Sequence, residues 1–129
     1  MLVWVTGLFC HRKEEIMKKT LIEGSSERIT YDLKLQIWKE DNYTCKYCGL
    51  YAAKDFETWY RAGLTIDHVL ARKHKGGNER SNLVTACHAC NKVKGQGRCE
   101  TIKDAKKVWR DRREVERAWF EKNIVPNRR

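Results

Sequence analysis

Four cysteines of this chain stand in two pairs that share one spacing. Cys45 and Cys48 form the first Cys-x-x-Cys pair, and Cys87 and Cys90 form the second. A gap of two residues lets both sulfurs of a tight turn face one point, and two such turns can complete a tetrahedron around zinc. Four thiolates leave that ion no open coordination position, so the spacing predicts a structural zinc site rather than a catalytic one.

The same cysteines could instead form two disulfide bonds. Nothing in the sequence indicates secretion, so we expect the chain in the reducing cytoplasm, with no evident targeting signal. Cys10 and Cys99 are left over, and we interpret them as free thiols. His88 lies inside the second pair and could replace one cysteine ligand, although a surface position or a phosphate contact is the favoured interpretation.

Other residues in this region have the chemistry that hydrolysis of a phosphodiester bond requires. An attacking water must lose a proton, and a neutral imidazole such as that of His68 is a suitable base near pH 7. The oxygens that gain negative charge need a hard divalent cation, which the oxygens of Asp67 and Asn91 could hold. Two-metal sites usually bring several carboxylates, so the single acidic residue of this cluster favours one metal ion.

A short strand–loop–strand–helix unit must position these residues. Residues 63–70 and 82–86 are predicted strands, residues 71–81 form a polar loop, and residues 87–94 form a turn that runs into a short helix. Two strands and a helix in this order can converge on one cleft. Because adjacent residues on a strand point to opposite sides, we expect the first strand to break or bulge at Asp67 and His68.

Helices are predicted on both sides of this unit. Residues 30–41 show helical spacing after Thr30, which can cap the helix. Residues 101–122 read as a long amphipathic helix, and its expected inner face consists of Ile102, Ala105, Val108, Trp109, Val115 and Trp119. The outer face is either a solvated surface or a rim that contacts phosphates, and it carries Lys103, Lys106, Lys107, Arg110, Arg113 and Arg117.

The composition favours a single basic domain. The chain has 129 residues, of which 41% are hydrophobic and 34% charged, and a formal net charge of +10. Four thiolates with one zinc ion would reduce this charge to about +8, which still attracts polyanions, nucleic acid first and acidic membrane surfaces second. No stretch approaches the roughly 20 apolar residues of a membrane span. We divide the chain into an N-terminal extension (1–28, with Met17 as an alternative start), a zinc-stapled domain (29–100) and a basic amphipathic helix packed on that domain (101–129).

Taken together, the motifs resemble the HNH (His-Asn-His) endonucleases, in the variant that carries four zinc cysteines. The resemblance runs from about Tyr43 to Gly95 and rests on four motifs in order: Tyr43-Thr44-Cys45-Lys46-Tyr47-Cys48-Gly49, Ile66-Asp67-His68-Val69-Leu70, Gly76-Gly77 with Ser81-Asn82-Leu83, and Cys87-His88-Ala89-Cys90-Asn91-Lys92-Val93-Lys94-Gly95. It implies an α+β fold, with a small ββα-metal (His-Me finger) core stapled by a four-cysteine structural zinc and flanked by helices.

The resemblance also implies a role for each signature residue. His68 would be the general base, and Asp67 and Asn91 would hold a catalytic divalent metal. Asn82 would fix the loop and orient His68 without touching the metal. Lys94 would lie near the substrate phosphates. The third signature position is asparagine instead of histidine, which makes this an H-N-N type site and leaves the preferred ion open between Mg²⁺, Mn²⁺ and others.

Further contacts with nucleic acid are expected from the basic residues around this site. Arg72, His74 and Lys92 are the candidates, although a basic surface loop is the simpler interpretation of the first two. The predicted function is a metal-dependent endonuclease that hydrolyses phosphodiester bonds in DNA. Two alternatives stay open, a catalytically idle zinc-dependent module that binds nucleic acid, and a nuclease directed at RNA. The sequence does not fix the oligomeric state, and a homodimer is compatible with it.

Overall fold

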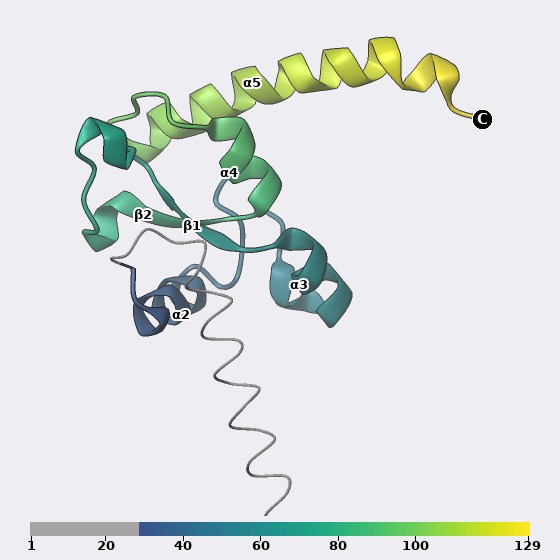
Figure 1. The fold of residues 1–129 in the computed structure, drawn as a ribbon. Coiled ribbons are helices and arrows are strands. Elements are labelled where there is room, and N and C mark those ends of the chain that lie inside the picture. Colours follow the sequence, from purple (N-terminus) through teal and green to yellow (C-terminus); the bar gives the residue numbers. More distant parts are fainter. Residues whose placement is uncertain (1–28) are drawn as a thin grey trace, which may run out of the picture. The chain divides into compact units, whose positions relative to one another are not determined.

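A computed structural model describes residues 29–129 of the chain (Figure 1). Residues 37–129 form one compact unit, and residues 29–36 belong to a separate unit. The predicted N-terminal extension and Cys10 lie outside the described residues. The helices and strands follow in the order α2 (Tyr31–Glu40), α3 (Phe56–Ala62), β1 (Thr65–His68), β2 (Leu83–Ala86), α4 (His88–Lys94) and α5 (Ile102–Asn123). The mixed α and β fold predicted from the sequence is confirmed.

The first described helix begins as its sequence predicts. The Thr30 hydroxyl accepts a hydrogen bond from the backbone N–H of Leu33 at 3.1 Å, which satisfies one of the free N–H groups at the start of α2. At its other end, Ile37 and Trp38 are fully buried. None of the helices within residues 29–129 combines the length and the apolar character that crossing a membrane would require.

The two strands form a short antiparallel hairpin. Thr65 pairs with Ala86 and His68 with Leu83, without an extra residue between them. Both strands are shorter than predicted, because Gly63 and Leu64 precede the paired region and Asn82 lies in a 3₁₀ turn (Arg80–Asn82). All four residues of β2 are buried, so the hairpin forms the centre of the domain.

The core of the domain is small and is built around aromatic and aliphatic side chains of this hairpin and its neighbours. Trp38 and Leu83 are fully buried, and Ile66 and Val69 are nearly so. Trp38 meets Trp59 edge to face at 5.3 Å between ring centroids, an arrangement that aromatic pairs prefer. A core of this size gives a modest hydrophobic stabilisation, so an additional metal staple is physically reasonable.

Helix α3 was not predicted from the sequence, although its end signals are present. Asp55 caps it by accepting a hydrogen bond from the Thr58 N–H at 2.7 Å, and Gly63 ends it with a φ of 52°. A left-handed conformation of this kind favours glycine after a helix. The aromatic segment between Asp55 and Gly63 is helical, and the two capping residues were the signal that could have revealed it.

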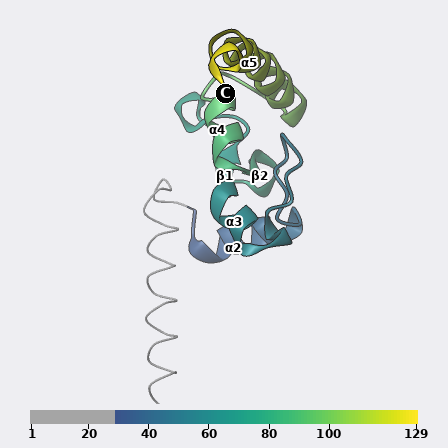
Figure 2. The same ribbon diagram turned by 90° about the vertical axis from the view of Figure 1, so that its right-hand side faces the viewer.

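Helix α4 lies between α5 and the hairpin in both views of the fold (Figures 1 and 2). Gly95 ends α4 with a φ of 66°, as its position in the sequence predicts. Thr101 and Asp104 then form a reciprocal capping box that starts α5, with bonds of 3.2 Å and 3.1 Å. The first half of α5 packs on α4, and an Arg112 guanidinium N–H donates to the Lys94 carbonyl at 2.5 Å.

The predicted inner face of α5 is correct only for the middle of its first half. Ala105 is fully buried and Val108 and Trp109 are half-buried, but Ile102, Val115 and Trp119 are 37%, 71% and 58% exposed. A helix of 22 residues is about 33 Å long at roughly 1.5 Å per residue, whereas α4 has only seven residues. The second half of α5 therefore extends past α4, and its apolar residues lie on the surface of the described chain.

Candidate functional site

The four cysteines of the two Cys-x-x-Cys pairs lie together. Their four sulfur atoms are all within 4.8 Å of one another, and the sulfurs of Cys48 and Cys87 are 3.8 Å apart. A tetrahedral zinc ion with Zn–S bonds of about 2.3 Å requires sulfurs roughly 3.8 Å apart. No disulfide joins any of these cysteines, and the described leftover Cys99 is also a free thiol. The chain thus presents a four-thiol cluster positioned to hold one metal ion.

The pKa values of the buried thiols in this cluster are consistent with binding of a cation. Hydrogen bonding with Cys87 lowers the pKa of the Cys45 thiol, whereas the hydrogen bond with Cys45 raises that of Cys87. Burial raises the pKa of Cys90 to about 12. Neighbouring sulfurs therefore cannot all ionise by themselves, and a divalent cation supplies the positive charge that would let all four be thiolates. His88 is exposed at the start of α4, so the ligand set needs no histidine.

The first cysteine turn is attached to the central hairpin by its backbone. The N–H of Lys46 donates to the Thr85 carbonyl in β2 at 2.9 Å. Within the turn, the Gly49 N–H donates to the Cys45 carbonyl at 3.0 Å, and Gly49 adopts a φ of 77°. These contacts hold the turn so that Tyr47, the second of the two residues between the cysteines, lies beside Asp67 near the end of β1.

Asp67 is held by Tyr47 of the first cysteine turn and by Lys94 of α4, the helix that contains Cys90. It is 6% exposed, and its Oδ2 accepts the hydroxyl proton of Tyr47 at 2.5 Å. The Lys94 ammonium, from the helix that follows the second turn, lies 3.1 Å from Oδ1 and 3.0 Å from Oδ2. The carboxylate predicted to bind a catalytic metal is thus oriented by two neighbours, each of which lies close in sequence to cysteines of the four-thiol cluster.

Burial dominates the electrostatics of this group. It raises the pKa of Asp67 above its usual value, and the bonds from Tyr47 and Lys94 oppose this shift without cancelling it. Burial and the nearby Asp67 charge also raise the pKa of Tyr47, so the phenol keeps its proton and acts as a donor. A pKa perturbed by desolvation together with defined partners is typical of functional carboxylates.

The structure corrects the expectation for Lys94. We predicted a contact with substrate phosphates, but this side chain is fully buried and has no accessible charge to offer. Besides Asp67, its ammonium donates to the backbone carbonyls of His68 at 2.5 Å and Val69 at 3.1 Å. An ammonium has three donors, and these partners use all of them, so Lys94 is an internal anchor for the end of β1.

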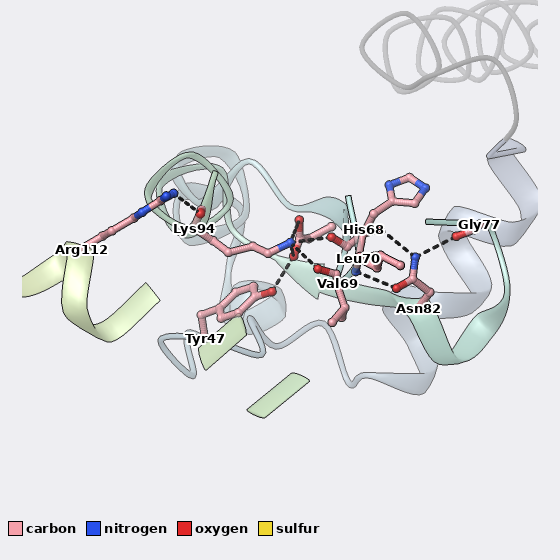
Figure 3. Close-up of polar contacts among 9 residues, drawn as sticks. Tyr47, His68, Val69, Leu70, Gly77, Asn82, Lys94 and Arg112 are labelled. Carbon is pink, nitrogen blue, oxygen red and sulfur yellow. Dashed lines mark hydrogen bonds and ion pairs between the residues drawn. The ribbon is translucent and has the colours of Figure 1, made fainter. Parts of the chain in front are cut away.

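The expected break or bulge at Asp67 and His68 is absent. Asp67 pairs with Val84 and His68 with Leu83 in an unbroken register, and the Val69 N–H continues the ladder to the Asn82 carbonyl at 2.9 Å. Because pairing is regular, the two side chains lie on opposite faces of the strand. Figure 3 shows the His68 imidazole pointing away from the Lys94 ammonium. The structure brings Asp67 to α4 and His68 to the loop that follows β1.

His68 has a hydrogen-bond partner in that loop. Its Nε2 lies 2.8 Å from Oδ1 of Asn78, and His68 itself is half-buried. An amide oxygen only accepts, so Nε2 is the protonated nitrogen and Nδ1 keeps the lone pair that could accept a proton. Asn78 was not among the predicted site residues, although it follows the Gly76-Gly77 pair in the sequence.

Asn82 clamps the loop between the strands. Its Oδ1 accepts from the Leu70 N–H at 2.8 Å, and its Nδ2 donates to the carbonyls of Leu70 at 3.1 Å and Gly77 at 2.9 Å. Gly76 completes the close approach, since a Cβ there would lie 1.6 Å from the Leu70 carbonyl oxygen. The position that the resemblance assigns to the loop-fixing asparagine is therefore occupied by a side chain with three bonds to that loop.

Asn91 lies in α4, one turn before Lys94. Residues three apart share a helix face, and Lys94 on that face contacts Asp67 and the end of β1. Asn91 is half-buried. An amide oxygen from α4 and a carboxylate from β1 are hard oxygen donors, and this donor pair suits a magnesium-type cation more than zinc.

The remaining basic candidates are distributed around this region. Lys92 is exposed and Arg72 half-buried. His74 is also half-buried, and its Nε2 lies 3.1 Å from the Gln96 carbonyl. The residues that sequence reasoning missed are Tyr47, Asn78 and Arg112. Only Tyr47 had a usable signal, because it lies between two metal-binding cysteines and a buried aromatic hydroxyl needs a partner.

Comparisons with known proteins agree with the motifs. The family model of HNH endonucleases matches residues 45–97. The CRISPR-associated endonuclease Cas9 of Corynebacterium diphtheriae is 33% identical to this chain over 84 residues, which are 64% of the chain but 7% of that relative. The chain therefore spans a small part of the length of the relative it matches, and no solved structure matches it. The segment from residue 45 to residue 97 carries the HNH endonuclease signature, as the order of its motifs predicted.

Proposed function

We propose that this chain is a metal-dependent endonuclease that hydrolyses phosphodiester bonds in DNA. A zinc ion bound by Cys45, Cys48, Cys87 and Cys90 fixes its structure, His68 acts as the general base, and a single Mg²⁺ or Mn²⁺ ion is bound through Asp67 and Asn91. The observation that supports this proposal best is the environment of Asp67. A buried carboxylate is held at the end of β1 by Tyr47 and Lys94, next to the histidine of the family motif.

The hydrogen bonds that Asp67 accepts leave at least one of its oxygen lone pairs available for a metal ion. A carboxylate has about four acceptor positions. Tyr47 occupies one on Oδ2, and the single Lys94 ammonium is shared between Oδ1 and Oδ2. At least one position is therefore free for a cation. A bound divalent cation would act as a Lewis acid that stabilises the negative charge of the phosphate and of the departing oxygen.

Side chains of the protein carry out proton transfer and positioning. His68 accepts the proton of the attacking water at Nδ1, while the bond between Nε2 and Asn78 fixes the imidazole plane. Asn82 holds the loop that carries Asn78. Asp67 and His68 are consecutive, so their Cα atoms are about 3.8 Å apart. The two side chains thus leave the strand at neighbouring backbone positions, on its opposite faces.

DNA is the proposed substrate because the domain is strongly basic and carries the endonuclease motif. The net charge of +10 attracts a polyanion, and phosphate contacts supply affinity without choosing a sequence. The chain covers only a small part of its Cas9 relative, so we propose no activity of that whole protein for it.

Cleavage of supercoiled plasmid tests the proposal directly. The unmodified protein should nick or linearise the plasmid with Mg²⁺ or Mn²⁺, and His68→Ala should reduce the rate at least about 100-fold, the usual size of a general-base contribution. His88→Ala is the matched control, because His88 is an exposed histidine of α4 that the proposal does not use in proton transfer or metal binding. Both variants should bind zinc and DNA like the unmodified protein.

The same experiment separates the proposal from its alternatives. Binding of the plasmid without cleavage under every ion tried would identify an idle nucleic-acid-binding module instead. Faster cleavage of a matched RNA than of the DNA would assign RNA as the substrate. Cleavage by His68→Ala at the unmodified rate would refute the general-base assignment.

A further inference from the structure

A hollow adjoins Tyr47, the residue that donates a hydrogen bond to Asp67. Its volume is about 440 Å³, within the range of small ligand sites, and it is lined by Tyr47, Ile102, Lys103, Lys106, Trp109 and Arg110. Five of these six residues come from the first three turns of α5. Tyr47 is thus shared between the hollow and the candidate active site, because its hydroxyl donates to Asp67.

The cations of this hollow differ from the other cations of α5. Lys107 pairs with Asp111 at 2.7 Å, and Arg117 pairs with Glu114 at 3.5 Å. Lys103, Lys106 and Arg110 have no acidic partner within residues 29–129, and no acidic residue lines the hollow. Their spacing of three and four residues places them along one side of the helix. Three uncompensated positive charges are thus gathered at one cavity.

Trp109, which also lines this cavity, has a buried polar atom without a partner within residues 29–129. Its indole Nε1–H is buried and has no hydrogen-bond partner among the described residues. The ring itself is held in place by Tyr47, at 6.1 Å between centroids, and by the Arg113 guanidinium, at 5.6 Å from the ring centroid. A buried donor without a partner costs free energy, so a ligand acceptor that reached it would be stabilised.

We propose that this hollow, the α5 pocket, binds a backbone phosphate of the DNA substrate. Three cations without acidic partners in the described part of the chain match the charge and the acceptor oxygens of a phosphate, and they would not favour a neutral or basic ligand. A phosphate held there would fix the position of the duplex relative to Asp67 through the shared Tyr47. This proposal rests on the proposed function for the identity of the nucleic acid.

Equilibrium binding of a fluorescein-labelled DNA duplex tests the pocket without relying on cleavage. All measurements use the His68→Ala protein with Mg²⁺, so that the duplex stays intact. The pocket variant carries Lys103→Gln, Lys106→Gln and Arg110→Gln together. The control is Lys122→Gln, which removes an exposed cation from the same helix about 24 Å away from Lys106, at roughly 1.5 Å per residue.

The pocket variant should bind the duplex at least 10-fold more weakly than the parent protein, and Lys122→Gln less than twofold. Affinity is measured between about 50 and about 200 mM salt. The slope of log affinity against log salt should be less steep by about 1 in the pocket variant than in the parent protein, as expected for one lost phosphate contact. Trp109→Phe keeps an aromatic ring but removes the N–H. It should weaken binding a few-fold and leave the salt slope unchanged.

The outcomes are independent of catalysis. If removal of Lys122 costs as much affinity per charge as removal of the pocket cations, only overall charge matters and the pocket proposal is wrong. If Trp109→Phe binds the duplex as tightly as the parent protein, the indole N–H does not contact the phosphate. Thermal melting of each variant checks that the fold is intact, and the single variant Lys106→Gln replaces the triple one if melting shifts. Failure of the protein with His68 to cut plasmid would refute the proposed function while leaving this binding result standing.

Discussion

The hydroxyl of Tyr47 donates a hydrogen bond of 2.5 Å to Oδ2 of Asp67. Tyr47 lies between Cys45 and Cys48, and Asp67 is the carboxylate proposed to bind the catalytic metal. The bond thus connects the first cysteine turn to the candidate active site. The second turn is connected as well, because Cys90 and Lys94 belong to the same short helix. The Asp67 carboxylate is therefore connected to both halves of the four-thiol cluster through Tyr47 and Lys94.

Tyr47→Phe should weaken the catalytic metal site and preserve the fold. The ring still packs against Trp109, but Asp67 loses one of the two partners that orient it. We expect the Mn²⁺ concentration for half-maximal cleavage to rise about 5- to 10-fold, equivalent to roughly 1 kcal/mol for one hydrogen bond. Titration of Mn²⁺ followed by electron paramagnetic resonance measures the same loss without activity. Tyr51→Phe, at an exposed tyrosine, is the control, and equal metal affinity in both variants would contradict the positioning role.

Lys94→Met should destabilise the domain strongly. The change leaves the buried Asp67 charge and two backbone carbonyls without their ammonium partner. Removal of one member of a buried ion pair costs about 3–5 kcal/mol, and urea denaturation measures the loss. Lys92→Met, at an exposed lysine of the same helix, should change stability by less than about 0.5 kcal/mol. Similar unfolding curves for the two variants would show that the Lys94 bonds carry little stability.

Cys87→Ser should reduce the yield of folded protein and abolish stoichiometric zinc binding. Cys87 is buried within the four-sulfur cluster, and a small core depends on such a staple. Zinc content by mass spectrometry and far-ultraviolet circular dichroism report the two effects. Cys99→Ala changes a buried cysteine outside the cluster and should keep the metal. A folded Cys87→Ser protein without zinc would overturn the structural role.

Asp41→Asn should destabilise the domain by about 1–3 kcal/mol at neutral pH, since Asp41 accepts bonds from the Thr85 N–H at 2.9 Å and from Arg80 at 3.0 Å. Burial alone would raise the pKa of Asp41, but the bond from the Thr85 N–H and the charge of Lys46 outweigh it and lower the pKa. The ionised group therefore stabilises the fold above its unfolded pKa near 3.9, and this contribution disappears as pH falls through the lower folded pKa.

The measurement is urea denaturation of the zinc-loaded unmodified and Asp41→Asn proteins at several pH values. The difference between their unfolding free energies should stay constant from about pH 8 to about pH 5, above the unfolded pKa. A difference that already shrinks across this interval would mean that folding raises the pKa of Asp41. Asp32→Asn, at an exposed aspartate of α2, provides the control.

The sequence alone determined the features that depend on spacing and local preference. The two Cys-x-x-Cys pairs predicted a four-sulfur cluster because two-residue gaps form tight turns, and Gly95 and Thr101 marked the ends of α4 and the start of α5. The order of the motifs indicated the HNH family. These signals involve residues close together in the chain, or residues whose types leave few alternatives.

Tertiary structure decided which side chains meet and which stay exposed. Lys94 was expected at the substrate but is buried, because the packing of α4 on β1 puts its ammonium beside an aspartate 27 residues earlier. Trp119 was expected to pack inward but is exposed, since α5 is longer than the domain beneath it. The composition of a side chain shows what it can bond to, but the partner it finds depends on distances that only the folded chain sets.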